Sequence, residues 1–290
     1  MGKRTAWIGA AVAAALAWAS AVPAGTQEFA KAMEEGRWGE AAAEGLALAE
    51  TLPRGPERCR VENDVAVARM NQGRWEEALG LLEGVEEACG LDAVVAYNLA
   101  HTHLMLGDHL EAVRYGSEAA RLGYRAPAIW LVLAEGQAGL GRWEEALASF
   151  LAFREADPYR PEGHRGVVLA LGRLGRWAEA AKAAEHILGM APLEQFDPGF
   201  QAMVGRIWAH TGKVERGREV LKRLVSLSPF DPELLVAMAD VELAAGDADR
   251  AMAVAQKAVF AGADPESVLK ELGKADDPRW REVVGRGPEE

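Results

Sequence analysis

The sequence is poor in basic residues and lacks the short motifs of common catalytic sites. Lys and Arg number 32 against 44 Asp and Glu, which gives a formal net charge of -12. This deficit argues against a nucleic-acid-binding protein, because affinity for nucleic acid comes largely from Lys and Arg side chains that neutralise phosphates. A glycine-rich phosphate loop, an HExxH zinc motif and a Ser or Cys in a recognisable nucleophile setting are all missing.

Hydrophobic runs long enough to span a membrane are also missing after residue 24. Before that point, Lys3 and Arg4 precede an uncharged, Ala-rich run that ends at Ala24. A basic start, an apolar stretch and a small-residue exit are the layout of a secretory signal. Small residues allow cleavage after Ala21 or Ala24, and we favour the second site.

Two alternatives to cleavage remain open for this segment, namely retention as an N-terminal membrane anchor and burial as a first helix. A lipoprotein anchor is excluded, because no Cys lies near the cleavage region. We expect residues 1–24 to be a cleaved signal peptide and the mature chain to be exported to a periplasmic or extracellular compartment.

An internal repeat accounts for most of the mature chain. A leading glycine recurs at spacings of 37, 34, 34, 34, 37 and 34 residues, with a small residue five positions later and, in five of the repeats, another seven positions earlier. Proline follows four of the glycines by 17 residues, where it would end a second helix. The leading glycines are Gly36, Gly73, Gly107, Gly141, Gly175, Gly212 and Gly246.

This period and order of residues resemble those of the tetratricopeptide repeat family, whose unit is a pair of antiparallel helices. The resemblance covers roughly residues 27–263 and implies an all-α fold, a right-handed α-solenoid of about seven hairpins. Residues 25–58 would form a degenerate first repeat, residues 59–263 repeats two to seven, and residues 264–290 a C-terminal capping helix and tail. Each leading glycine should end a first helix in a left-handed conformation. The Trp that follows it in four repeats should fill space between hairpins.

The two cysteines both fall in the second hairpin. Cys59 opens its first helix and Cys89 closes its second. Because the helices of a hairpin run antiparallel, these ends lie side by side, and an oxidising compartment would favour a disulfide. The alternative is a pair of free, partly buried thiols.

Histidines offer the most obvious metal candidates, but their spacing argues against a site. Side chains at His101 and His103 are two positions apart on a helix and point in different directions, unlike ligands at i and i+4. Repeats and cap leave no segment of domain size for a catalytic fold. We therefore expect no enzyme activity, no metal and no cofactor.

The family resemblance implies that a ligand lies against the first helix of each hairpin, on the concave wall. This places an apolar surface in the N-terminal half and a basic surface in the C-terminal half, suited to an apolar segment and to a carboxylate-rich segment of a polypeptide. The alternative is that these are ordinary solvated positions, with the arginines paired to neighbours such as Glu162. The predicted groove residues are Val67, Met70, Val94, Tyr97, Leu104, Met105, Leu131, Arg165, Arg173, Arg206 and His210.

The family's clamp for chaperone C-termini is not reproduced. Asn98 occupies a matching place, but Asn63 and Val67 stand in the preceding hairpin where Lys and Asn are wanted. The sequence thus predicts an exported scaffold or adaptor that binds a protein or peptide. An envelope assembly or secretion factor that chaperones exported polypeptides is the main alternative, and docking of a separate catalytic subunit is a third.

Overall fold

The structure is a computed structural model that describes residues 24–284. This part of the chain contains sixteen α-helices, one short 3-10 helix and no strand, which confirms the predicted all-α repeat fold. The predicted signal peptide lies outside the described residues except for Ala24, the first residue of helix α2. The chain divides into two compact units, Met1–Pro158 and Tyr159–Glu290.

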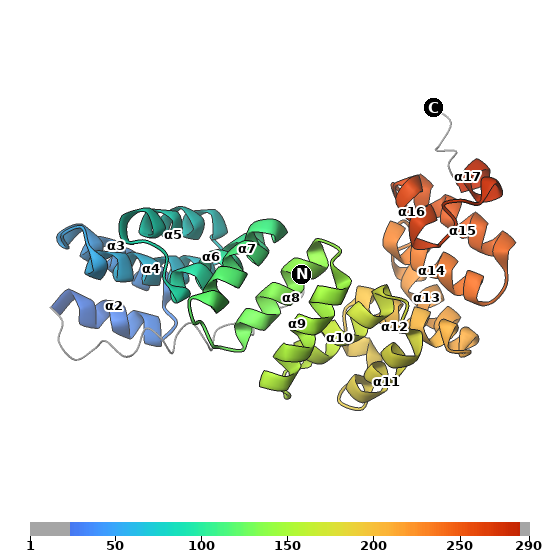
Figure 1. The fold of residues 1–290 in the computed structure, drawn as a ribbon, viewed down its shortest axis with the longest axis horizontal. Helices are drawn as coiled ribbons and strands as arrows, with labels where there is room; N and C mark the ends of the chain where they lie inside the picture. The colour runs from blue at the N-terminus through green and yellow to red at the C-terminus, as the bar shows by residue number, and fades with distance from the viewer. Residues whose placement is uncertain (1–23, 285–290) are drawn as a thin grey trace. The chain divides into compact units, whose positions relative to one another are not determined.

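Unit 1 consists of four helical hairpins, in which each helix packs against the next one along the chain (Figure 1). Its helices are α2 (Ala24–Glu34), α3 (Trp38–Thr51), α4 (Pro56–Asn71), α5 (Trp75–Cys89), α6 (Ala93–Leu106), α7 (His109–Arg121), α8 (Ala128–Gly139) and α9 (Trp143–Ala156).

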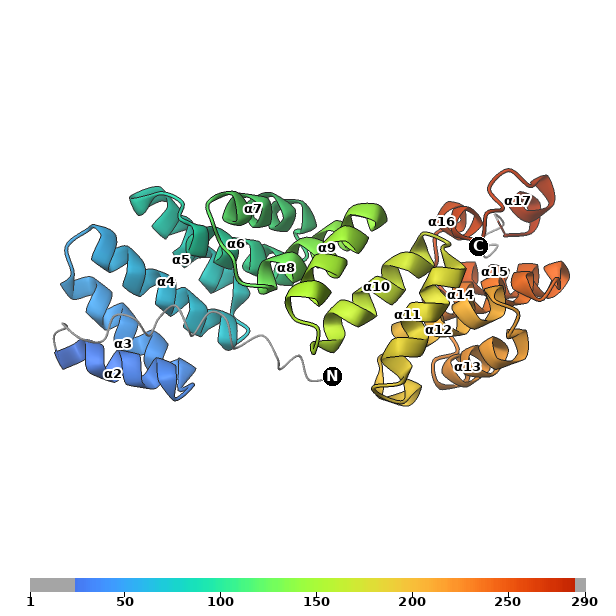
Figure 2. The ribbon, with the colours of Figure 1, turned by 60° about the horizontal axis from the view of Figure 1, so that its bottom comes forward.

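Unit 2 has three hairpins and two short terminal helices (Figure 2). Its elements are α10 (Pro161–Arg173), α11 (Trp177–Leu188), the 3-10 helix η2 (Leu193–Gln195), α12 (Pro198–His210), α13 (Val214–Leu227), α14 (Pro232–Ala244), α15 (Ala248–Phe260), α16 (Pro265–Glu271) and α17 (Pro278–Val284).

The leading glycines end the first helices as predicted. All seven have a positive φ, between 67° and 86°, a region that costs glycine little because it has no Cβ. In the second hairpin, Gly73 donates its N–H to the carbonyl of Met70, and Arg74 donates to Arg69. These two bonds form a Schellman motif, which satisfies carbonyls that the end of α4 would otherwise leave unpaired.

Several first helices begin with an aspartate cap. The carboxylate of Asp92 accepts two backbone N–H bonds of 2.8 Å at the start of α6. Asp231 caps α14 with two such bonds and Asp197 caps α12 with one, and Asp264 caps the short helix α16 with one; a proline follows each of the three. Aspartate supplies an acceptor for free N–H groups, and proline fits the first helical position because that position needs no donor.

Second helices end where the proline pattern predicts. Helices α3, α9 and α13 stop two residues before Pro53, Pro158 and Pro229, and α11 stops four residues before Pro192. The small residues of the repeat lie where the two helices of a hairpin meet, and those that are alanines are 0% exposed. They let the helices of a hairpin approach closely, which explains their recurrence.

The C-terminal cap differs in detail from the sequence prediction. A capping helix and a tail were expected over residues 264–290, whereas the described part of this segment contains two short helices, α16 and α17. Val268, Leu269, Trp280 and Val284 are buried with apolar residues of α14 and α15. Both short helices thus cover the apolar side of the last hairpin, which has no following repeat to bury it.

Candidate functional site

The first helices of unit 2 carry a cluster of basic side chains that we call the arginine site: Arg173 of α10 with Arg206 and His210 of α12. Arg206 donates from Nε to Asp240 Oδ2 at 2.7 Å and from Nη1 to Glu271 Oε1 at 2.7 Å. Arg173 reaches the same Glu271 oxygen at 2.9 Å. The site therefore already binds two carboxylates, one from α14 and one from α16.

His210 completes the arginine site from the other side of Asp240. Its Nε2 lies 2.9 Å from Asp240 Oδ2, and its ring stacks on the indole of Trp177 with centroids 4.0 Å apart and planes 2° from parallel. Trp177 belongs to the preceding hairpin, so this contact confirms, for Trp177, the prediction that a repeat tryptophan fills space between hairpins. It also holds the imidazole in one orientation.

The charges of the site compensate for its burial. Burial acts to lower the pKa of Arg206, but the charges of Asp240 and Glu271 outweigh it and raise that pKa above its usual value. Burial likewise acts to raise the pKa of Asp240, but the hydrogen bond with His210 and the charge of Arg206 lower it below its usual value. Both groups are therefore ionised at neutral pH.

Arg165 lies on the same helix as Arg173 but has a different partner. Its Nη1 donates to Asp197 Oδ2 at 2.7 Å, while the other oxygen of Asp197 caps α12. Glu162, the neighbour considered from the sequence, pairs instead with Arg160 at 3.0 Å. Each predicted basic residue thus contacts a carboxylate, and none stands as an isolated cation.

The predicted apolar wall of unit 1 is mostly buried. Tyr97, for example, stacks on Tyr124 of the α7–α8 connection with ring centroids 4.3 Å apart, and Leu131 is 1% exposed. Neighbouring hairpins use these side chains for packing, which leaves little of them for a ligand to contact. Val67, Met70, Tyr97, Leu104 and Leu131 are buried, whereas Val94 and Met105 are half-buried.

The cysteines form the predicted disulfide. Cys59 at the start of α4 and Cys89 at the end of α5 are bonded, with their Cα atoms 6.5 Å apart. The antiparallel arrangement of the two helices brings these ends together, as the hairpin interpretation required.

The two histidines considered as metal candidates, His101 and His103, pack on different aromatic rings. His101 lies edge-on to Trp75 with ring centroids 5.7 Å apart, and burial lowers its pKa to about 4. His103 stacks on Tyr115. Within residues 24–284, no group of three or more His, Cys, Asp or Glu side chains is arranged to hold a metal ion.

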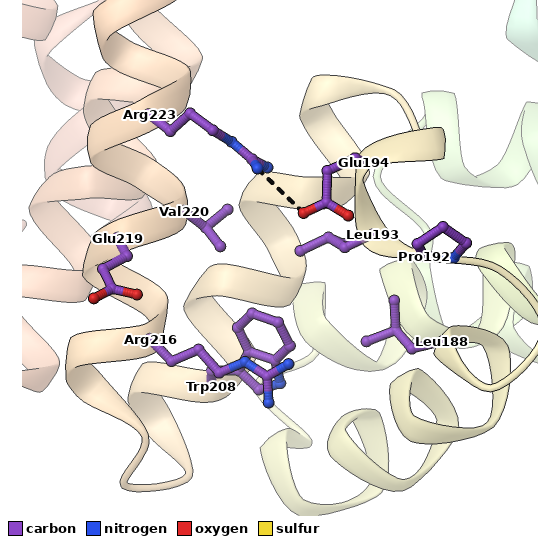
Figure 3. Close-up of a pocket in the computed structure, with 9 residues that line it drawn as sticks. All are labelled: Leu188, Pro192, Leu193, Glu194, Trp208, Arg216, Glu219, Val220 and Arg223. Atoms are coloured by element: carbon purple, nitrogen blue, oxygen red, sulfur yellow. Dashed lines mark hydrogen bonds and ion pairs between the residues drawn. The ribbon is translucent and has the colours of Figure 1, made fainter.

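A separate open cavity of about 490 Å³ lies between α11, η2, α12 and α13 (Figure 3). The leading glycines of this repeat and the next are 37 residues apart instead of 34, and η2 lies in this longer connection. The Arg216 guanidinium lies 3.7 Å over the Trp208 ring, and Arg223 pairs with Glu194 across the rim. The cavity is lined by charged side chains of both signs, mainly from the second helix α13. None of the residues of the arginine site lines it.

Sequence reasoning missed both carboxylates of the arginine site. Asp240 was detectable, because it follows Arg206 by 34 residues and so occupies the same repeat position in the next first helix. Glu271 lies outside the repeats, 98 residues from Arg173, and no periodicity points to it. Trp130 was also missed, although it is an exposed large apolar side chain of α8 next to the buried Leu131.

Among the described helices, none is long and apolar enough to cross a membrane.

Several solved structures have a similar fold. A tetratricopeptide repeat protein from Parabacteroides merdae ATCC 43184 is 15% identical with a TM-score of 0.55, over 92% of this chain and 99% of its own. YrrB, described as "a TPR protein with an unusual peptide-binding site", is 17% identical with a TM-score of 0.51, over 72% and 96% of the two chains. The Cut9–Hcn1 hetero-tetramer of the APC/C gives 16% identity and a TM-score of 0.57, over 86% of this chain and 48% of that one.

No curated protein matches the chain. The family model described as "Tetratricopeptide repeat" matches residues 97–161, 168–232 and 211–268, which together exceed half of the sequence. This fold is a scaffold for protein–protein interaction. Its helical hairpins, its glycine-led period and this match show that the chain belongs to the tetratricopeptide repeat family.

Proposed function

We propose that this protein is an exported scaffold that binds a polypeptide partner along the first helices of its hairpins, with an acidic segment of the partner at Arg165 and Arg173 of unit 2. The observation that carries the proposal is the orientation of these guanidinium groups: both already donate to carboxylates, at 2.7 and 2.9 Å. A planar guanidinium matches a carboxylate geometrically, which gives such contacts specificity as well as energy.

The fold supports the same proposal. Tetratricopeptide scaffolds present their first helices as one surface, and YrrB, a protein of similar fold, is described as having a peptide-binding site. In this chain the half-exposed arginines lie on α10, whereas the apolar positions of unit 1 are largely buried. Charge recognition in unit 2 is therefore better supported than apolar recognition in unit 1.

Export is supported by the N-terminal segment and by the disulfide. Disulfides persist in oxidising compartments and are rare in the cytosol, and Cys59–Cys89 is the chain's one possible bridge. The test is the intact mass of the protein from the envelope or medium fraction of its native host. A chain beginning at Gly25 is expected, and a full-length chain confined to the cytosol would refute export.

The binding site is tested by charge reversal on exposed positions. In the double variant Arg165→Glu and Arg173→Glu, capture of a native partner from the envelope should fall at least about tenfold, because two attractive contacts become repulsive. The matched control reverses Arg121 and Arg223, which lie on the second helices α7 and α13. Retention of the partner by the first variant would refute the site.

The same capture separates a scaffold from a chaperone. A scaffold should retain one or two folded partners, and the protein should leave the aggregation of unrelated unfolded chains unchanged. Capture of many unfolded clients, together with suppression of their aggregation, would instead establish the envelope-chaperone alternative.

A further inference from the structure

The short helix α16 delivers a carboxylate into the arginine site. Glu271, its last residue, contacts Arg173 of α10 at 2.9 Å and Arg206 of α12 at 2.7 Å. These partners precede it by 98 and 65 residues, so the next-to-last helix of unit 2 contacts the unit's first helix, α10. The backbone of α16 is held in place from its other side, where Val268 and Leu269 are buried against α14 and α15.

The two carboxylates of the site differ in accessibility. The side chains of Arg206 and Asp240 are each 9% exposed, so their pair is enclosed, and removing either group would leave the other charge buried. Glu271 and Arg173 are 34% and 39% exposed. An exposed ion pair of this kind is screened by solvent and contributes little to stability.

Glu271 is therefore the accessible carboxylate of the site: its pair with Arg173 is open to solvent, and Arg206 keeps Asp240 as a buried partner when Glu271 is removed. If the Glu271 side chain rotated away, the N–H groups of Arg173 and Arg206 that now donate to it would become available to another acceptor. Helix α16 would stay in place through its buried Val268 and Leu269. A glutamate or aspartate supplied by another chain would then meet the same two guanidinium groups.

We infer that Glu271 is an intramolecular competitor for the arginine site, and that the ligand of this site is an acidic peptide segment whose carboxylate replaces that of Glu271. The inference rests on the proposed function, since it specifies the ligand chemistry and the regulation of the same surface. A protein whose site is already filled binds more weakly, because the apparent affinity falls with the fraction of molecules that are free to bind.

The test uses the full-length mature chain and a fluorescein-labelled hexaglutamate peptide as the probe, with hexaglutamine as the uncharged control. Binding is followed by fluorescence anisotropy at low ionic strength, where exposed charges act at longer range. The variant Glu271→Gln keeps the shape of the side chain and removes its charge. Its matched control is Glu266→Gln, which removes the charge of an exposed glutamate on the same helix. The third variant, Arg173→Gln, removes the accessible arginine.

We expect Glu271→Gln to bind hexaglutamate about five- to tenfold more tightly than the native protein, as release of an intramolecular competitor requires. Glu266→Gln should stay within about twofold, since it changes only the net charge. Arg173→Gln should weaken binding about fivefold, alone or combined with Glu271→Gln, because it removes an ionised donor.

The outcomes separate the inference from the proposed function. If Arg173→Gln weakens binding but Glu271→Gln does not strengthen it, the carboxylate site stands and the competitor is refuted. Equal strengthening by Glu266→Gln and Glu271→Gln would show a bulk charge effect and also refute the competitor. If none of the three substitutions changes the affinity for hexaglutamate, or if the peptide does not bind at all, both the inference and the acidic-ligand site are overturned.

Discussion

The hairpin formed by α12 and α13 brings two glycines together at positions where most other repeats carry alanine. Gly205 lies seven residues before the leading glycine of its repeat, and Gly217 lies five residues after it. A Cβ added at Gly217 would approach the carbonyl oxygen of Gly205 closer than 3.0 Å, a separation that real Cβ atoms essentially never show. These two helices therefore pack more closely than an alanine at position 217 would permit.

Two opposing effects decide the result of Gly217→Ala. Alanine favours the helix over glycine by about 1 kcal/mol. Overpacking a close contact costs about 1 to 3 kcal/mol, and the upper part of that range applies because the obstacle is backbone, which moves only if the helices separate. We expect a net destabilisation of about 1 to 2 kcal/mol for Gly217→Ala.

The assay is urea unfolding followed by far-ultraviolet circular dichroism, with the midpoint as the readout. Gly84→Ala is the matched control, since Gly84 lies inside α5 with nothing within 4 Å of an added Cβ. This control should be more stable by up to about 1 kcal/mol, because only the helix preference changes. A Gly217→Ala variant as stable as the native protein would refute the close approach of α12 and α13.

Three further perturbations test other parts of the structure. Replacing Cys59 by Ser should lower the stability of unit 1 by about 3 to 4 kcal/mol in the chain-entropy model, and two reactive thiols in the denatured, unreduced native chain would contradict the bridge to Cys89. Replacing Arg218 by Met should cost about 3 kcal/mol in urea unfolding, because Glu242, which is 0% exposed, loses its closest cation; an unchanged midpoint would contradict this. Burial raises the pKa of Asp64 to about 6, so its protonated form is favoured in the fold and native stability is lost as pH rises from about 4 through 6. Asp64→Asn should therefore become more stable than the native protein by about 1 to 2 kcal/mol at pH 7 but not at pH 4, and an advantage that does not grow with pH would refute the assignment.

The repeat architecture was predictable because it depends on local chemistry that recurs at a fixed period. Glycine at the end of a first helix, alanine at the helix contact and proline after a second helix each act within a few residues of their own position. Gly73 adopts the left-handed conformation, Ala78 is fully buried and α9 ends before Pro158, as the pattern indicates. The disulfide followed for the same reason, since both cysteines belong to one hairpin.

The accessible surface was not predictable to the same degree. Val67 and Leu131 lie on first helices, but packing between neighbouring hairpins buries them. Position on a helix says which side a residue faces, whereas burial depends on the distance and angle between helices. Trp130, one residue before Leu131, is exposed.

The sequence by itself determined that this chain is a series of helical hairpins with a bridged second repeat, because those features need only contacts within a repeat and its neighbour. Only the tertiary structure decided which carboxylates meet the arginines. Glu271 reaches Arg173 because successive hairpins turn relative to one another, and the sum of those rotations is set by side-chain packing at each interface rather than by the repeat pattern.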